Sequence, residues 1–168
     1  IENIDIGGPA LVRSAAKNFG DVVVITSNYQ FEDLIHEMNI NKGTTSFKFR
    51  KKLSQEAFNE TAYYDSNISK YFGKINDSKF PKKITINGTL INKLRYGENP
   101  HQLGAFYSRG NFNELEKLNG KELSYNNYND IYYGLDIINN LPKGIGTIII
   151  KHANPSGVSI NKKQFFSY

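Results

Sequence analysis

TIIIKHANPSG, residues 147–157, carries the strongest structural signal in the chain. The run Thr147–Ile150 is continuously β-branched, which is typical of a strand buried on both faces of a sheet. Lys151 and His152 follow it, and Asn154-Pro155 indicates that the strand breaks there. Because α/β sheets bind ligands at the carboxyl ends of their strands, this stretch predicts both a strand and a candidate site.

The first third of the chain also predicts an α/β layer. Residues 21–26 (DVVVIT) form a second β-branched run, so we expect another strand buried on both faces. Helices are expected over 9–18, where Pro9 suits the first helical position and Asn18 the end, and over 29–39, where apolar residues recur at helical spacing. Helix, strand and helix in this order predict parallel pairing.

The middle of the chain predicts a long helix and then a domain boundary. Apolar residues form one broad stripe over 44–74, and one of the hydroxyl residues at 44–46 is placed to cap its start. Residues 76–83 are polar and contain Pro81, which indicates a linker. We therefore expect one domain over 1–75 and the start of another over 84–168.

The second domain is expected to begin with a hairpin. Residues 84–86 and 90–91 are apolar, and Asn87-Gly88 between them is a two-residue turn signal. A further strand is expected at 104–108. A helix is expected over 127–140, which Pro142 and Gly144 would stop.

Composition excludes several classes of protein. The 168 residues include no Cys, which excludes a disulfide framework, thiolate catalysis and Cys-ligated zinc. No apolar run is long enough to span a bilayer, so a transmembrane protein is not expected. The three His residues are widely separated, so no metal site is expected. The chain begins at Ile1 and ends soon after Phe165 and Phe166, and we expect an internal piece of a longer protein.

The net charge of +5 leaves several partners open. The basic runs at 48–52 (KFRKK) and 79–83 (KFPKK) are typical of a solvated face. With 11 Tyr and 11 Phe, a nucleic-acid-binding module is an alternative, because aromatic rings stack on bases. Phosphorylated small molecules are another partner class that a basic protein attracts.

Asp5-Ile6-Gly7-Gly8-Pro9 is the first of three segments that could carry chemistry. Two glycines before a helix let the backbone approach a ligand, and the free N–H groups of the first turn favour an anion. Asp5 could bind a polar ligand, and Lys17 adds a charge at the far end of the same helix. The alternative is a loop and helix start with no ligand.

RYGENPHQ, residues 95–102, is the second segment. Arg95 offers a fork for phosphate or carboxylate, and Tyr96 can stack on a heterocycle or donate a hydrogen bond. The alternative is a structural loop held by its own side chains.

The third segment is 151–157, where His152 suits a general base and Lys151 can stabilise a developing oxyanion. Neighbouring strand residues point to opposite faces, so both can reach one site only where the strand breaks. The alternative is a Lys in solvent and a His satisfied by the backbone.

Four segments in order resemble one family, that of the bifunctional purine-biosynthesis enzyme AICAR transformylase/IMP cyclohydrolase. They are IDIGGPALVRSAAKN at 4–18, LRYGENPHQ at 94–102, GKELSYNN at 120–127 and IIIKHANPSG at 148–157. The resemblance implies an α/β fold in two parts: the end of a methylglyoxal-synthase-like domain over 1–75, then the start of a cytidine-deaminase-like domain. Two residues depart from the family pattern. Ala10 stands where the family often has Thr or Ser, and Ser156 stands where bacterial members commonly have Cys.

The resemblance also implies roles for particular residues. Asp5 and Ile6, with Gly7 and Gly8, match the nucleotide-contacting segment of the cyclohydrolase, and Lys17 matches its proton donor or acceptor. In the transformylase, four residues match. Arg95 and Tyr96 match AICAR-binding residues, His152 the general base and Lys151 the transition-state stabiliser; Asn126 is also expected to face AICAR.

The reaction implied is formyl transfer from 10-formyltetrahydrofolate to the AICAR amine, followed by dehydrative closure of FAICAR to IMP. The resemblance implies no metal or redox cofactor, a cytosolic homodimer, and neither nucleic acid nor membrane as a partner. Because most of the family's transformylase domain is absent, we expect the isolated chain to be inactive. A non-catalytic scaffold fragment remains an alternative.

Overall fold

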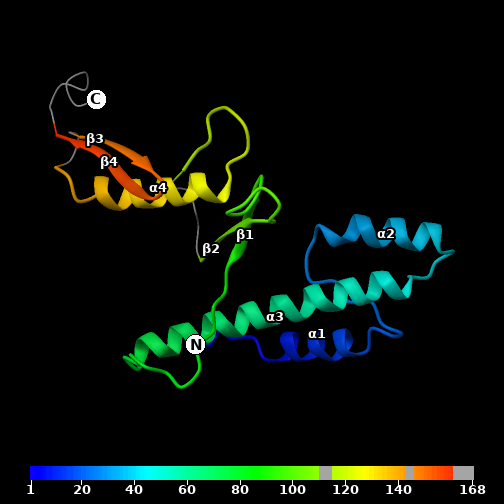
Figure 1. The fold of residues 1–168 in the computed structure, drawn as a ribbon. Helices are drawn as coiled ribbons and strands as arrows, with labels where there is room; N and C mark the ends of the chain where they lie inside the picture. Colours follow the sequence, from blue (N-terminus) through cyan, green and yellow to red (C-terminus); the bar gives the residue numbers. More distant parts are fainter. Residues whose placement is uncertain (110–114, 143–145, 161–168) are drawn as a thin grey trace. The chain divides into compact units, whose positions relative to one another are not determined.

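The computed structural model of the chain describes residues 1–109, 115–142 and 146–160, which fall in two compact units, Ile1–Asn87 and Gly88–Tyr168. The first unit has helices α1 (Gly7–Lys17), α2 (Gln30–Ile40) and α3 (Phe47–Ile75) in its described residues. In the second, helix α4 (Tyr125–Ile138) accompanies strands β1 (Thr89–Lys93), β2 (Ala105–Ser108), β3 (Thr147–Lys151) and β4 (Asn154–Ser159) (Figure 1). The chain therefore combines helices with small sheets.

The first unit is built on the contact of α1 with α3, which lie side by side (Figure 1). Ala16, Leu53 and Ala57 are its buried apolar residues, and the Ser54 hydroxyl donates to the carbonyl of Ala16 at 2.7 Å. Small side chains let the two helices approach closely, so that this hydrogen bond can form.

All three helices predicted in the first unit are confirmed. Ser46 caps α3 by accepting a hydrogen bond from the Phe49 N–H at 3.3 Å. Helix α1 begins at Gly7, so Pro9 occupies its third position, where the missing N–H also has no partner within the helix. Asn18 is the C-cap, as predicted.

The predicted strand at 21–26 is wrong. Residues 22–26 are half-buried and form a connection between α1 and α2, and the described part of this unit contains no strand. The end of the connection is instead held by the buried Gln30, whose Oε1 accepts from the N–H groups of Thr26 at 2.8 Å and Ser27 at 3.0 Å. A β-branched run becomes a strand only where a neighbouring strand supplies hydrogen bonds.

In its described residues, the second unit contains two antiparallel hairpins, β1–β2 and β3–β4, and α4 contacts both. The Phe106 ring of β2 stacks on Tyr128 of α4 with centroids 4.6 Å apart. A Cβ at Gly134 of α4 would lie 3.4 Å from Ile150 of β3, so the two elements touch closely. Parallel pairing, predicted for the first unit, does not occur there, because the described residues of that unit form no strand.

The hairpin predicted around Asn87-Gly88 is wrong. Asn87 is buried: its side-chain nitrogen donates to Asn67 of α3 at 2.6 Å, and its oxygen accepts from Lys70. Thr85 accepts from the Ser66 hydroxyl at 3.0 Å. These polar contacts fix 84–87 against α3, and β1 pairs with β2 instead.

The strand predicted at 104–108 and the helix predicted at 127–140 are confirmed as β2 and α4. Helix α4 begins earlier than predicted because Ser124 and Asn127 form a reciprocal capping box. The strand predicted at 147–150 is confirmed as β3, but Ile149 is 45% exposed, because α4 covers one face of its two-stranded sheet. Gly144, Phe165 and Phe166 lie outside the described residues.

Candidate functional site

The loop at 94–104 is fixed to the start of α4. The Arg95 N–H donates to the carbonyl of Leu123, and the Tyr125 N–H donates to the carbonyl of Tyr96, each at 3.2 Å. Gly97 is buried, and a Cβ there would lie 3.0 Å from the Cβ of Gln102. The loop is thus closed and tightly packed, as expected of the alternative in which this segment is a structural loop. Arg95 and Tyr96 are neighbours within it.

Arg95 and Tyr96 interact directly. The Arg95 guanidinium lies 4.9 Å from the centre of the Tyr96 ring, and its Nη2 donates to the Tyr96 hydroxyl at 3.2 Å. A hydrogen bond with the Ser124 side chain lowers the pKa of Tyr96 below 10.0, and the Arg95 hydrogen bond and charge lower the pKa further. The pair therefore offers a planar cation and an aromatic ring beside each other, with a phenol that gives up its proton more readily than usual.

Asn126, in the first turn of α4, lies beside the same loop. Its side-chain nitrogen donates to the carbonyl of Glu98 at 3.1 Å. The structure therefore brings together three of the predicted site residues, Arg95, Tyr96 and Asn126.

Lys151 and His152 lie at a tight turn. Lys151 ends β3 and pairs with Asn154 of β4, so His152 and Ala153 form a two-residue hairpin loop. Their φ angles are 52° and 61°, which identifies a type I′ turn. The strand does break between Lys151 and His152, as predicted, but Asn154 and Pro155 lie within β4 rather than causing the break.

This turn is attached to α4 as well. The Ala153 N–H donates to the carboxylate of Asp130 at 2.7 Å. Asp130 lies four residues after Asn126, and residues four apart share one face of a helix. The first half of α4 therefore holds both the Arg95–Tyr96 loop and the Lys151–His152 turn, and both Lys151 and His152 are exposed.

The first candidate segment has a different structure. The carboxylate of Asp5 accepts a hydrogen bond from the Gly8 N–H at 3.0 Å, and the Asp5 N–H donates to the Tyr64 hydroxyl at 2.8 Å. Asp5 therefore takes one of the first-turn N–H groups that were predicted to hold an anion. Ile6 precedes the helix and is 75% exposed.

Lys17 lies at the other end of α1 from Gly7 and Gly8. Lys17 comes ten positions after Gly7, which is about 15 Å along a helix. The structure therefore does not bring Lys17 next to the glycines, and its exposed ammonium sits in the last turn, where the helix dipole favours a cation.

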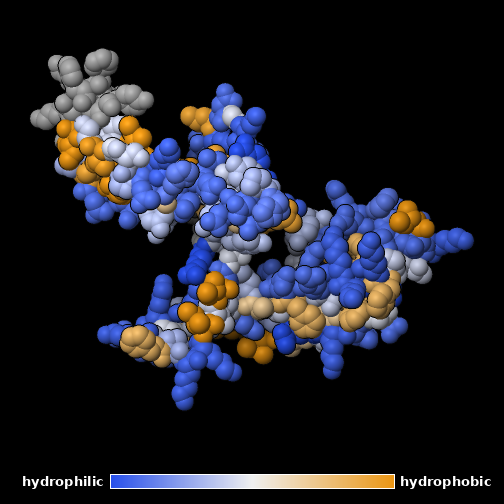
Figure 2. Space-filling view, in the orientation of Figure 1, coloured by the Kyte–Doolittle hydropathy of each residue, from blue (hydrophilic) through white to orange (hydrophobic). Residues whose placement is uncertain are grey.

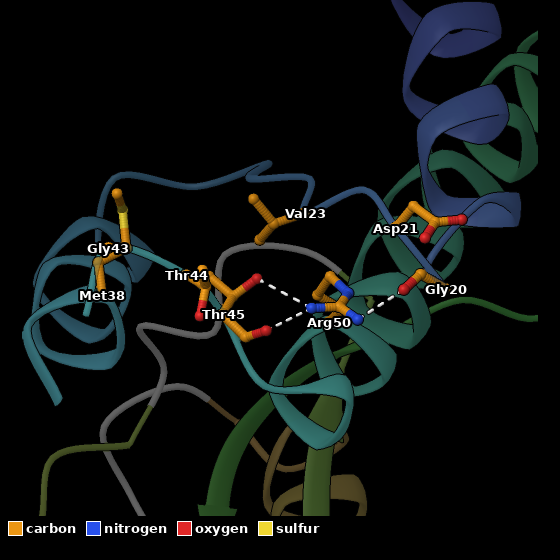
Figure 3. Close-up of a pocket in the computed structure, with 8 residues that line it drawn as sticks. All are labelled: Gly20, Asp21, Val23, Met38, Gly43, Thr44, Thr45 and Arg50. Atoms are coloured by element: carbon orange, nitrogen blue, oxygen red, sulfur yellow. Dashed lines mark hydrogen bonds between the residues drawn. The ribbon is translucent and has the colours of Figure 1, made fainter. Parts of the chain in front are cut away.

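A cavity of about 390 Å³ in the first unit was not predicted from the sequence. Arg50 lines it, and Figure 3 shows its guanidinium between Thr45 and Gly20. The guanidinium donates to the carbonyl of Phe19 at 2.9 Å and to those of Gly20 and Thr45. Arg50, within the basic run at 48–52, therefore satisfies main-chain carbonyls, and none of the predicted site residues lines this cavity.

The described residues hold neither a candidate metal site nor a helix that could cross a membrane. Across 1–109, 115–142 and 146–160, no three His, Asp or Glu side chains gather in a way that could hold a metal ion. Among the helices of the same residues, none is both long enough and apolar enough to cross a bilayer.

Comparison with known proteins gives a family match over almost the whole chain. The model of the AICARFT/IMPCHase bienzyme matches residues 15–168. The bifunctional purine biosynthesis protein PurH of Bradyrhizobium diazoefficiens is 43% identical to this chain, and that of Jannaschia sp. is 45% identical to it. Each match covers 95% of this chain. The PurH protein of Rhizobium rhizogenes is 41% identical over the full chain. These matches cover 31%, 32% and 32% of the relatives, so the chain spans about a third of their length.

Proposed function

Since the chain belongs to the AICARFT/IMPCHase bienzyme family, we propose that it forms part of an enzyme for the last two steps of de novo IMP synthesis. Residues 1–75 contribute to an IMP cyclohydrolase domain with a methylglyoxal-synthase-like fold. Residues 84–168 begin an AICAR transformylase domain with a cytidine-deaminase-like fold, and residues 76–83 form the linker between the two domains. The division into compact units after Asn87 supports this arrangement. The observation that carries the proposal is the attachment of Arg95, Tyr96 and the His152 turn to one half of α4.

In the formyl transfer, the exocyclic amine of AICAR attacks the formyl carbon of 10-formyltetrahydrofolate. That amine is a weak nucleophile because it is conjugated with the carboxamide. His152 accepts the amine proton as the new C–N bond forms. Lys151 stabilises the oxyanion of the tetrahedral intermediate, which then releases tetrahydrofolate with a proton on its nitrogen. The exposure of both side chains at the turn supports these roles.

Arg95, Tyr96 and Asn126 bind the AICAR nucleotide in this proposal. The guanidinium of Arg95 suits an anionic or carboxamide oxygen group, and the Tyr96 ring suits the imidazole. The side-chain nitrogen of Asn126 donates one N–H to the Glu98 carbonyl, which leaves its side-chain oxygen and its second N–H for the nucleotide.

In the ring closure, the carboxamide nitrogen of FAICAR attacks the new formyl group and water leaves. This step needs orientation and proton transfer rather than a covalent intermediate. Lys17 donates or accepts the proton, and Asp5, Ile6, Gly7 and Gly8 contact the nucleotide. The whole enzyme is a cytosolic homodimer that uses 10-formyltetrahydrofolate as its co-substrate, and the isolated chain is inactive.

The test is a chimera in which this chain replaces the matching third of the Bradyrhizobium relative. His152→Asn should lower the kcat of formyl transfer about 10²- to 10⁴-fold, because the base is lost. Lys151→Met should lower kcat about 10²-fold or more. Ring closure, started from FAICAR, should be unchanged in both variants.

His36→Asn is the matched control, because this exposed histidine lies on α2 in the first unit. It should leave formyl transfer unchanged. A full rate in His152→Asn and Lys151→Met would reject the proposed roles and favour the scaffold alternative.

A further inference from the structure

We propose that Asp130 is a positioning residue that holds the His152–Ala153 turn and so aims the Lys151 and His152 side chains. The effect of Asp130 on catalysis rests on the proposed function, whereas the effect of Asp130 on the structure of the turn is independent of that function. Lys151 and His152 lie in a segment that resembles a family motif, whereas Asp130 lies outside all four resembling segments.

The turn needs a support because its backbone is strained. His152 and Ala153 have φ angles of 52° and 61°, in the left-handed region. Type I′ turns favour Asn or Gly at these positions, and other residues held there are strained. The sequence therefore places two unfavourable residues at the point where the proposed base is presented.

Asp130 supplies a strong external hydrogen bond to this turn. Its Oδ1 lies 2.7 Å from the Ala153 nitrogen, at a separation of 23 residues, and a carboxylate is a stronger acceptor than a neutral group. Asn154 adds a local bond by donating its side-chain N–H to the His152 carbonyl at 2.8 Å. The turn is therefore anchored to α4 by one side chain and braced within the hairpin by another.

The anchor acts on His152 through the backbone. Fixing the Ala153 N–H fixes the peptide plane after His152, and with it the direction in which the imidazole leaves the chain. Without the anchor, the two residues can relax to negative φ, which splays the strands and moves the Lys151 and His152 side chains apart. Asp130 also shares a helix face with Asn126, so the anchor places the turn relative to the nucleotide-binding loop.

The first experiment uses the 168-residue chain itself and measures hydrogen exchange of the Ala153 amide by NMR. Asp130→Ala should speed this exchange about tenfold or more, because a charge-assisted hydrogen bond is lost. Asp130→Asn, which keeps an acceptor oxygen, should recover most of the protection. Asp136→Ala, at an exposed carboxylate on the same helix, should have no effect.

The second experiment measures formyl transfer in the chimera. Asp130→Ala should lower kcat about tenfold and leave KM for AICAR within about twofold, because the base is displaced and the nucleotide site is kept. Adding Ala153→Gly should restore most of kcat, because glycine adopts the turn without the anchor.

The outcomes separate the two proposals. Unchanged exchange in Asp130→Ala, or a double variant no faster than Asp130→Ala alone, would overturn the positioning role. An equal loss in Asp130→Ala and Asp136→Ala would show general destabilisation and would also overturn it. Full activity of His152→Asn would overturn the proposed function and leave the exchange result standing.

Discussion

At the scale of single residues, the candidate site depends on contacts that are specific to particular atoms. Tyr96 is the clearest case, because its hydroxyl meets Arg95 and its carbonyl accepts from Tyr125. One residue thereby joins the proposed binding loop to α4 and tunes a titratable group. The ring that the sequence indicated for stacking is therefore also a structural link.

The lowered pKa of Tyr96 gives a pH prediction. The hydrogen bond with Ser124 is the largest cause and Arg95 the next, so Ser124→Ala should raise the pKa of Tyr96 more than Arg95→Gln does. Because the folded-state pKa lies below the ordinary value of 10.0, this tyrosine stabilises the fold above that value, and the contribution is lost as pH falls through the folded pKa. The ¹³Cζ signal of Tyr96 followed against pH would measure the pKa.

Ser124→Thr is the control, because threonine keeps the hydroxyl and the cap of α4. It should leave the pKa of Tyr96 nearly unchanged. An equal pKa in Ser124→Ala and the wild-type chain would contradict the assignment of the largest cause to Ser124.

At the scale of elements, the start of α1 shows how a predicted anion site is occupied by the chain itself. A Cβ at Gly8 would lie 2.3 Å from Oδ2 of Asp5, whereas nothing lies within 4 Å of a Cβ at Gly7. Gly8→Ala should therefore displace Asp5, and the loss of its hydrogen bond, about 1 kcal/mol, should offset the gain that alanine brings to a helix. Gly7→Ala should stabilise the unit by up to about 1 kcal/mol, because alanine favours the helix.

Thermal unfolding followed by circular dichroism at 222 nm would compare the two alanine variants. The midpoint of Gly7→Ala should lie above those of the wild type and Gly8→Ala, which should be close to each other. Equal midpoints in Gly7→Ala and Gly8→Ala would contradict the role given to Asp5.

The elements that could be predicted from the sequence are those whose signal is local. The helices were found because apolar spacing and capping residues such as Ser46 lie within the helix itself. The strand at 21–26 and the turn at Asn87 could not be predicted correctly, because a β-branched run or an Asn-Gly pair does not reveal which segment lies beside it. The position of Asn87 is set by the hydrogen bonds of its side chain with Asn67 and Lys70.

The same difference applies to the candidate site. The loop at 95–102 and the turn after Lys151 were found because their polar residues are contiguous and resemble family motifs. Asp130 was missed because its contact with Ala153 joins residues 23 apart. Its spacing of four from Asn126 was the one signal that the sequence carried.

At the scale of the whole molecule, the chain has a small core and a large apolar surface. The buried apolar residues of the described chain are Ala16, Leu53 and Ala57, and Figure 2 shows hydrophobic residues at the surface of both units. This exposure supports the proposal that the chain is one segment of a longer enzyme.

The small core predicts weak and separable unfolding. Because the slope of stability against urea scales with the surface exposed on unfolding, each unit should unfold with a slope of about 1 kcal/mol/M or less. Leu53, 1% exposed, should be essential: Leu53→Ala removes about 2–5 kcal/mol and should abolish the transition of the first unit. Leu11 on α1 is 73% exposed, so Leu11→Ala should leave that transition in place. Urea titration followed by NMR would measure the unfolding transition of each unit separately. One shared transition with a slope near 3 kcal/mol/M would contradict this prediction, because it would require a larger buried core than the described residues provide.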